Sequence, residues 1–173
     1  MPRFDQASAS CEIHTFREGL LAAMGHDLKI AVTRFSIDVD EATRAVRATF
    51  DARSLKVVGE LHGGSLSAKD TAEIEENIAT KVLDVDRHPT ITFTSSAVEP
   101  EGSGFRVRGE LELHDKRRMI STVTRLEGGR QIAEVTLHQP DYGIKPYKAP
   151  LGVIKVKPDI VVKISVPWAA AAS

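Results

Sequence analysis

The stretch GFRVRGELEL, Gly104–Leu113, changes between apolar and polar residues at almost every step. Successive side chains of a β-strand point to opposite faces, so this alternation predicts a strand with one buried and one solvated face. The predicted buried face consists of Phe105, Val107, Gly109, Leu111 and Leu113. A glycine within this row of large residues is expected to leave free space on the inner face, where a ligand could pass.

Similar alternation recurs on both sides of this stretch. Upstream, the apolar set changes phase near Thr33–Arg34, between HDLKIAV (26–32) and RFSIDVD (34–40), which predicts a β-bulge or bend. All the alternating runs together give about eight strands, joined mostly by short turns and therefore antiparallel. Closure removes exposed sheet edges, so we predict an all-β fold, an eight-stranded antiparallel barrel. A two-sheet sandwich is the alternative.

One segment departs from the β pattern. Ile74, Ile78 and Val82 recur every fourth residue, which predicts one helix over about residues 67–83, covering the barrel. Ser67 is placed to cap its first turn by accepting a hydrogen bond from the backbone N–H near Asp70. A second, short helix is expected near residues 18–24, ending at Gly25.

The composition is that of an ordinary soluble globular protein. The 173 residues include 42% hydrophobic residues, and 23 Lys and Arg stand against 24 Asp and Glu. A net charge of -1 without basic clusters argues against nucleic-acid binding. No segment is apolar and long enough to span a membrane, and the start lacks the apolar core of a signal peptide. We therefore expect a cytoplasmic protein, or a periplasmic one if an export signal was removed.

Candidate catalytic and metal-binding residues are few. The single cysteine, Cys11, cannot form an intramolecular disulfide, and the six histidines form no HExxH or comparable pattern. No Gly-x-Ser-x-Gly elbow or phosphate-binding loop is present. His14 and His26 could meet across neighbouring strands, with Asp27 as an orienting carboxylate. This keeps open an enzyme acting on a small hydrophobic substrate; otherwise we expect no metal, cofactor or catalytic residue.

The central and C-terminal motifs resemble the YceI-like family. In SLSAKDTAEIEENIATKVLDVDRHPTITFTSSAV, an acidic helix leads into a Pro-x-Ile-x-Phe-x-Ser strand that begins at Pro89. GFRVRGELELHDKRR is similar to the next hairpin, although Asp115-Lys116-Arg117 replaces the usual Gly-Val-Thr turn. DYGIKPYKAPLGVIKVKP is similar to the closing segment, and TFREGLLAAMGHDLKI to the stretch before the second strand. The resemblance covers residues 10–167 as one domain, with 1–9 and 168–173 as terminal extensions.

The resemblance implies a lipocalin-like barrel whose lumen holds a long apolar chain, typically a polyisoprenoid or isoprenoid quinone. We therefore expect a non-catalytic binding or carrier protein for one long-chain amphipathic lipid. A filled barrel that acts through a protein partner is another alternative, and a homodimer stays open. The expected cavity lining or mouth consists of Leu28, Ile30, Phe50, Phe93, Phe105, Val107, Leu111, Tyr142, Ile144 and Tyr147, with polar contacts from His26 and Lys145.

The turn-rich stretch YGIKPYKAPLG, residues 142–152, precedes the last strand and is expected at an open end of the barrel. Its prolines stiffen the connection, and Tyr142 and Tyr147 combine an apolar ring with a polar tip. Lys145 and Lys148 could meet a phosphate or quinone head group. These residues fit either a rim that contacts the ligand or a structural cap, and the sequence leaves both open.

Overall fold

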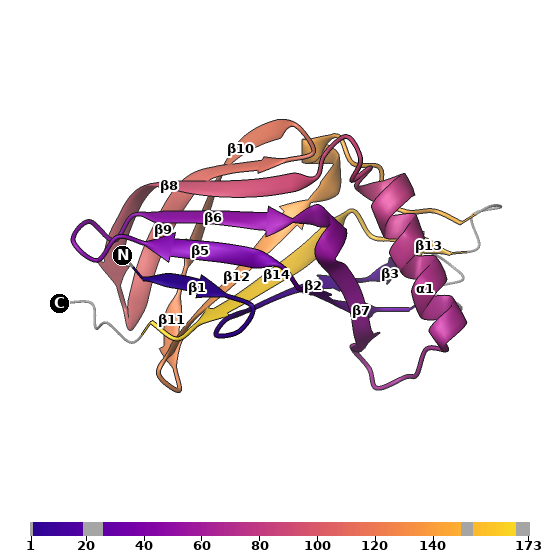
Figure 1. Cartoon of the computed structure of the whole chain (residues 1–173), viewed down its shortest axis with the longest axis horizontal. Coiled ribbons are helices and arrows are strands. Elements are labelled where there is room, and N and C mark those ends of the chain that lie inside the picture. The colour runs from indigo at the N-terminus through magenta and orange to yellow at the C-terminus, as the bar shows by residue number, and fades with distance from the viewer. Residues whose placement is uncertain (1, 19–25, 150–153, 169–173) are drawn as a thin grey trace.

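Two six-stranded antiparallel sheets enclose the interior of the molecule (Figure 1). The computed structural model describes residues 2–18, 26–149 and 154–168. The first sheet consists, in spatial order, of β1 (Arg3–Asp5), β5 (Phe35–Val39), β6 (Val46–Asp51), β8 (Thr90–Glu101), β9 (Gly104–Leu113) and β10 (Lys116–Val123). The second consists of β11 (Arg125–Glu127), β12 (Arg130–His138), β14 (Asp159–Val166), β2 (Ser10–Thr15), β4 (Leu28–Val32) and β7 (Leu55–Glu60). β13 (Lys155–Val156) pairs with β3 (Arg17–Glu18).

Two long strands bend from one sheet into the other. β4 and β5 are separated only by Thr33 and Arg34, where the predicted phase change occurs, so that prediction is confirmed as a bend. β6 and β7 are joined in the same way by a 3₁₀ turn, Ala52–Ser54. Ser54 holds the two bends together: Thr33 N–H donates to its carbonyl oxygen at 3.0 Å and Arg34 N–H to its Oγ at 3.0 Å.

The all-β fold is confirmed, but the ring of strands is not closed by backbone pairing. If β4 with β5, and β6 with β7, are each counted as one bent strand, the long strands are antiparallel to their neighbours, as predicted. The short strands β1, β3, β11 and β13 were not predicted. Within the described part of the chain, β10 and β12 form no ladder and are bridged instead by Thr122 Oγ1, which donates to Glu134 O at 3.0 Å. β10 pairs with β9 along its whole length and therefore belongs to the first sheet.

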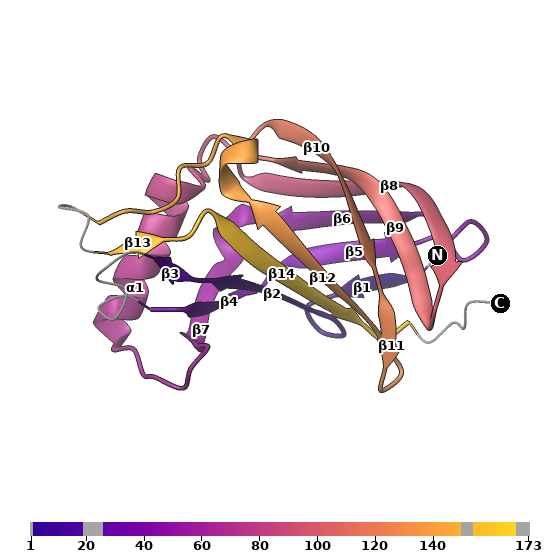
Figure 2. The same cartoon turned by 180° about the vertical axis from the view of Figure 1, so that it is seen from behind.

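The predicted helix covers one end of the interior. α1 (Ala68–Asn77) is continued by a π-helical turn, η3 (Ile78–Val82). Together the two elements match the predicted helix over residues 67–83. Asp70 N–H donates to Ser67 Oγ at 3.0 Å, as the capping pattern predicted. Ile74 and Ile78 pack against the main apolar cluster, because the helix turns its apolar stripe toward the sheets. We call this the helix end of the molecule (Figures 1 and 2).

The opposite end, here called the hairpin end, carries the turns Asp40–Ala45 and Glu101–Gly104 together with β11 (Figure 2). Part of the expected N-terminal extension is a strand, because Arg3–Asp5 pairs with β5. Trp168, the first residue of the expected C-terminal extension, stacks on Phe105. Of the short helix expected near 18–24, only Glu18 is described, and it belongs to β3; the rest lies outside the described residues. None of the helices in the described ranges is long and apolar enough to cross a membrane.

Candidate functional site

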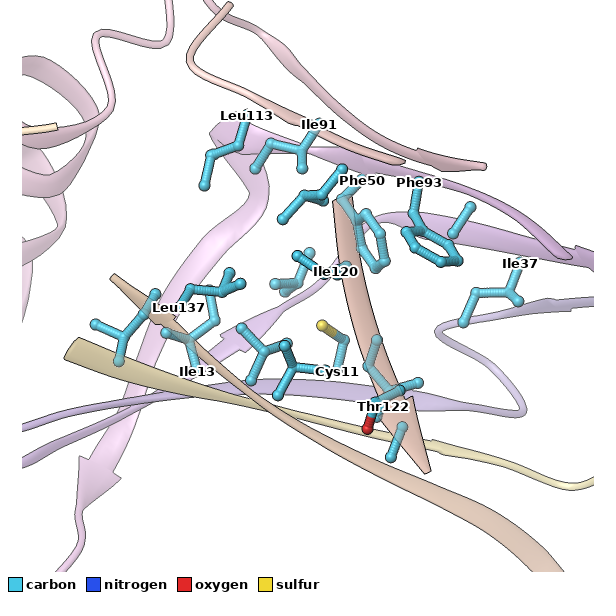
Figure 3. Close-up of a pocket in the computed structure, with 18 of the residues that line it drawn as sticks. Cys11, Ile13, Ile37, Phe50, Ile91, Phe93, Leu113, Ile120, Thr122 and Leu137 are labelled. Atoms are coloured by element: carbon cyan, nitrogen blue, oxygen red, sulfur yellow. The ribbon is translucent and has the colours of Figure 1, made fainter. Parts of the chain in front are cut away.

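An apolar cavity of about 280 Å³ lies between the two sheets. Side chains from both sheets point into it, among them Phe50, Phe93 and Ile37 from the first sheet and Cys11 and Ile13 from the second (Figure 3). It follows β12 from Gln131 at the hairpin end to the residues beyond Leu137 at the helix end. The interior is therefore an elongated space rather than a core filled by side chains.

The lining of this cavity is almost entirely aliphatic and aromatic. Among the described residues that line it there is no aspartate, glutamate, lysine, arginine or histidine. The neutral polar exceptions are Thr15, Thr122, Thr124, Gln131, Gln139, Tyr142 and Trp168. Burial, reinforced by the nearby Asp141 carboxylate, raises the pKa of Tyr142, so its phenol is uncharged at neutral pH. Such a surface favours an apolar ligand, since an unpaired ion would lose its hydration there.

Most of the residues predicted to contact a ligand lie on this lining. They are Ile30, Phe50, Phe93, Phe105, Val107, Leu111, Tyr142 and Ile144. Tyr142 and Ile144 belong to the turn-rich stretch before the last strand; they are 2% and 4% exposed and close the helix end. Part of that stretch is therefore wall of the cavity, whereas its other described residues, 143 and 145–149, are not.

Four residues of the predicted set lie elsewhere. Leu28 is packed in the main apolar core and does not line the cavity. The Tyr147 hydroxyl accepts a hydrogen bond from Asn77 Nδ2 at 3.3 Å, so this ring is held against α1. His26 Nδ1 bonds to Glu60 Oε1, and Lys145 is exposed to solvent. Leu28 is a strand residue whose side chain packs into the core, and the positions of the other three depend on a chain path that spacing does not specify.

Gly109 does not open the cavity as expected. A Cβ atom built on it would lie 2.6 Å from Phe93 Cζ and 2.7 Å from Ser95 Cα, and would also collide with Thr94 O. The ring of Phe93 and the backbone of β8 thus occupy the space beside the glycine. A β-bulge in β8 lies beside this position, between Ser95, the register partner of Gly109, and Ala97.

The structure does not bring His14 and His26 together as a site. His14 is in register with Lys29, three residues beyond His26, and its Nε2 bonds to Glu12 Oε1 at 3.1 Å. Asp27 accepts from Arg17 N–H at 2.7 Å and from His62 Nε2 at 2.7 Å. Neither histidine lines the cavity. No group of three or more potential metal ligands occurs within the described ranges.

The sequence matches the YceI-like domain family over residues 5–168, which is nearly the whole chain. The chain belongs to the YceI-like family. No match is found among curated proteins. Solved structures with the same fold include Burkholderia cenocepacia BcnA, at a TM-score of 0.67 and 18% identity, covering 94% of this chain and 97% of that one.

Two other solved structures resemble this YceI-like chain. One is a polyisoprenoid binding domain from Saccharophagus degradans, with a TM-score of 0.61, 12% identity and coverage of 95% and 94% of the two chains. The other is the Campylobacter jejuni YCEI protein, with a TM-score of 0.53, 14% identity and coverage of 75% and 76%. At these identities the likeness establishes the lipocalin-like fold alone.

Much of the cavity wall in the YceI-like domain was absent from the predicted site. The additional wall residues of β10, β12 and β14 include Ile120, Thr122, Gln131, Ala133, Val135, Leu137, Ile160, Val162 and Ile164. The signal was present, because these residues alternate along their strands as strictly as Phe105 and Leu111 do. Alternation identifies an inward face, but only the spacing of the sheets decides whether that face meets side chains or empty space.

Cys11 of the YceI-like domain is buried at 3% exposure on the cavity wall. Burial, with a smaller contribution from Glu12, raises the pKa of its thiol to about 12. The thiol ionises near 8.5 in an unfolded chain. Between these values the unfolded state has lost the proton and the folded state keeps it, so stability falls as pH rises.

We expect this loss of stability to depend on Cys11. Urea unfolding should show that the native protein loses roughly 2 kcal/mol more between pH 7.5 and pH 10 than Cys11→Ala does, since each pKa unit corresponds to about 1.4 kcal/mol. Lysine and tyrosine titrate in both proteins and cancel in the comparison. Equal losses in the two proteins would show that the thiol ionises without hindrance in the folded state.

Proposed function

We propose that this protein binds one lipid with a long apolar chain, of the polyisoprenoid or isoprenoid-quinone class, in the cavity between its sheets. The observation that carries the proposal is the wall itself, which combines both sheets, is elongated, and presents no charged side chain among its described residues. Each methylene transferred from water to such a wall contributes about 0.8 kcal/mol. A long chain therefore gains far more than a compact polar metabolite.

Two comparisons support this choice of ligand class. The chain belongs to the YceI-like family, and the solved Saccharophagus degradans domain of the same fold is a polyisoprenoid binding domain. The enzyme alternative gains no support, because His14 and His26 bond to different glutamates and neither reaches the cavity. Holding and releasing a lipid requires a protected apolar space and no reacting group, and the cavity meets that requirement.

The direct test is to identify what the protein carries. Protein purified from cells under mild conditions should be extracted with organic solvent, and the extract analysed by mass spectrometry. A long-chain isoprenoid in near-stoichiometric amount, absent from an equally treated unrelated protein, is the expected result. The emptied protein should then take up diphenylhexatriene, an uncharged rod that fluoresces only in apolar surroundings. Protein that yields no lipid and does not bind this rod would refute the proposal.

Filling the cavity from within should abolish binding. Ala133 lies on the inner face of β12 between Gln131 and Val135, so Ala133→Phe places a ring in the lumen. We expect at least about tenfold weaker binding of diphenylhexatriene, because a phenyl ring displaces several methylene contacts. The matched control is Thr136→Phe, which adds a ring to the exposed face of the same strand. Binding that is unchanged in Ala133→Phe, or equally weak in both variants, would contradict the location.

A further inference from the structure

The hairpin end of the cavity contains a buried amide with unused hydrogen-bond donors. Gln131 is 3% exposed and shares the inner face of β12 with Ala133, Val135 and Leu137. Its Nε2 atom is buried and has no hydrogen-bond partner in the described part of the protein. Buried donors are normally paired, because an unpaired donor loses its hydration without compensation. This exception lies on the wall of an apolar cavity and points to a ligand.

A chain of hydrogen bonds fixes which end of the amide faces the ligand. Phe105 N–H donates to Thr124 Oγ1 at 3.0 Å, and the Thr124 hydroxyl donates to Gln131 Oε1 at 2.7 Å. In this arrangement the Thr124 hydroxyl has the Gln131 carbonyl as its acceptor, which turning the amide over would remove. The carbonyl end of Gln131 is thus occupied, whereas the buried Nε2 atom of the amide is unpaired in the described part of the chain. Two donors select a partner that accepts hydrogen bonds.

The surroundings of Gln131 disfavour a charged ligand group and suit a planar, uncharged ring. Phe105 and Trp168 both line the cavity here and stack with ring centroids 5.1 Å apart at 16°. The nearest arginine along the chain, Arg130, is engaged by Ser165 Oγ at 2.6 Å and by backbone carbonyl oxygens. Arg44 lies over the Phe105 ring, 5.5 Å from its centroid, but is not part of the wall. A phosphate at Gln131 would find no cation among the described residues of the wall.

We propose that Gln131 recognises an uncharged oxygen acceptor, a ring carbonyl of the quinone type, on the head group of the bound lipid. The head group then lies at the hairpin end beside Phe105 and Trp168, and the apolar tail extends toward α1. This inference rests on the proposed function and narrows it, from polyisoprenoids or isoprenoid quinones to the lipids among them that have a neutral carbonyl head group. It also gives the ligand one orientation along the cavity.

Among the described residues, the opposite end of the cavity has no equivalent group. Gln139 also lines the wall there, but its Nε2 donates to Lys157 O at 3.1 Å and is therefore satisfied. Thr15 Oγ1 has no partner, but a hydroxyl both donates and accepts, so it does not select for an acceptor. Of the two glutamines on the described part of the wall, only Gln131 has an unpaired amide nitrogen, and Gln139 is therefore its control.

The test uses three probes with the same heptyl tail: 2-heptyl-1,4-benzoquinone, heptylbenzene and 4-heptylphenyl phosphate. Their Kd values are measured by displacement of diphenylhexatriene from the full-length protein. The quinone should bind about tenfold more tightly than heptylbenzene, the effect of one buried hydrogen bond, and the phosphate should bind most weakly. Trp168 is the only tryptophan in the chain, so the bound quinone should also quench its fluorescence.

Two variants assign the preference to one residue. Gln131→Met keeps the size of the side chain and removes its donors, so the quinone should lose its advantage while heptylbenzene binding stays within about twofold. Gln139→Met should leave the preference of the native protein for the quinone intact.

Three results would each overturn the inference: a preference for the quinone that survives Gln131→Met, a native protein without this preference, or tighter binding of the phosphate than of the quinone. In those cases heptylbenzene binding still supports the proposed function; failure of every probe rejects both. If Gln131→Met does not fold, the native preference and the quenching decide.

Discussion

Replacing Phe105 by alanine should lower the free energy of unfolding by about 3–5 kcal/mol, the usual cost of deleting a buried aromatic ring. Phe105 is 1% exposed, stacks on Trp168 and lies beneath the guanidinium of Arg44. The ring connects β9 to the end of β14, so its loss leaves a hole where the two sheets meet at the hairpin end. The measurement is chemical denaturation followed by circular dichroism.

Phe4→Ala is the matched control for this change. Phe4 lies on the edge strand β1 and is only half-buried, so the same truncation there should cost less than half as much. If the two variants lost equal stability, the packing between Phe105 and Trp168 would contribute little. Phe105→Ala should also remove tryptophan quenching by the quinone, since Trp168 would lose the partner that holds its ring.

Gly109→Ala is expected to cost about 3 kcal/mol, although it adds only one carbon, because two of the three atoms it would meet belong to backbone. Thr94 O and Ser95 Cα are fixed in the ladder between β8 and β9, so they cannot withdraw. Of the three atoms, only Phe93 Cζ belongs to a side chain that could move. Thermal and urea unfolding would both report the loss.

Gly64→Ala is the control for this prediction, since a Cβ there meets only the side-chain carboxylate of Glu60, which can turn away at the cost of its bond to His26. A double variant, Phe93→Leu with Gly109→Ala, separates side-chain from backbone crowding. If backbone is the obstacle, shortening Phe93 should recover little of the lost stability. Full recovery would instead show that the ring alone fills the space beside Gly109.

The sequence by itself determined the local geometry of this protein. Period-two alternation predicted the strands and their inward faces, and the change of phase at Thr33–Arg34 predicted the bend. The spacing of Ser67 and Asp70 predicted the helix start, confirmed by their hydrogen bond. All of these depend on neighbours a few residues apart, whose steric and hydrogen-bonding preferences act wherever the segment lies.

Only the tertiary structure decided what the inward faces enclose. Alternation makes no distinction between Leu28, which fills the core, and Ile30, which lines the cavity two residues later. The alternation predicted an open space beside Gly109, which β8 occupies in the structure. It also gave no reason to distinguish Gln131 from its neighbours on β12. These outcomes depend on the separation of two sheets built from strands distant in sequence. The balance of all inter-strand contacts fixes that separation, and no single segment of the chain encodes it.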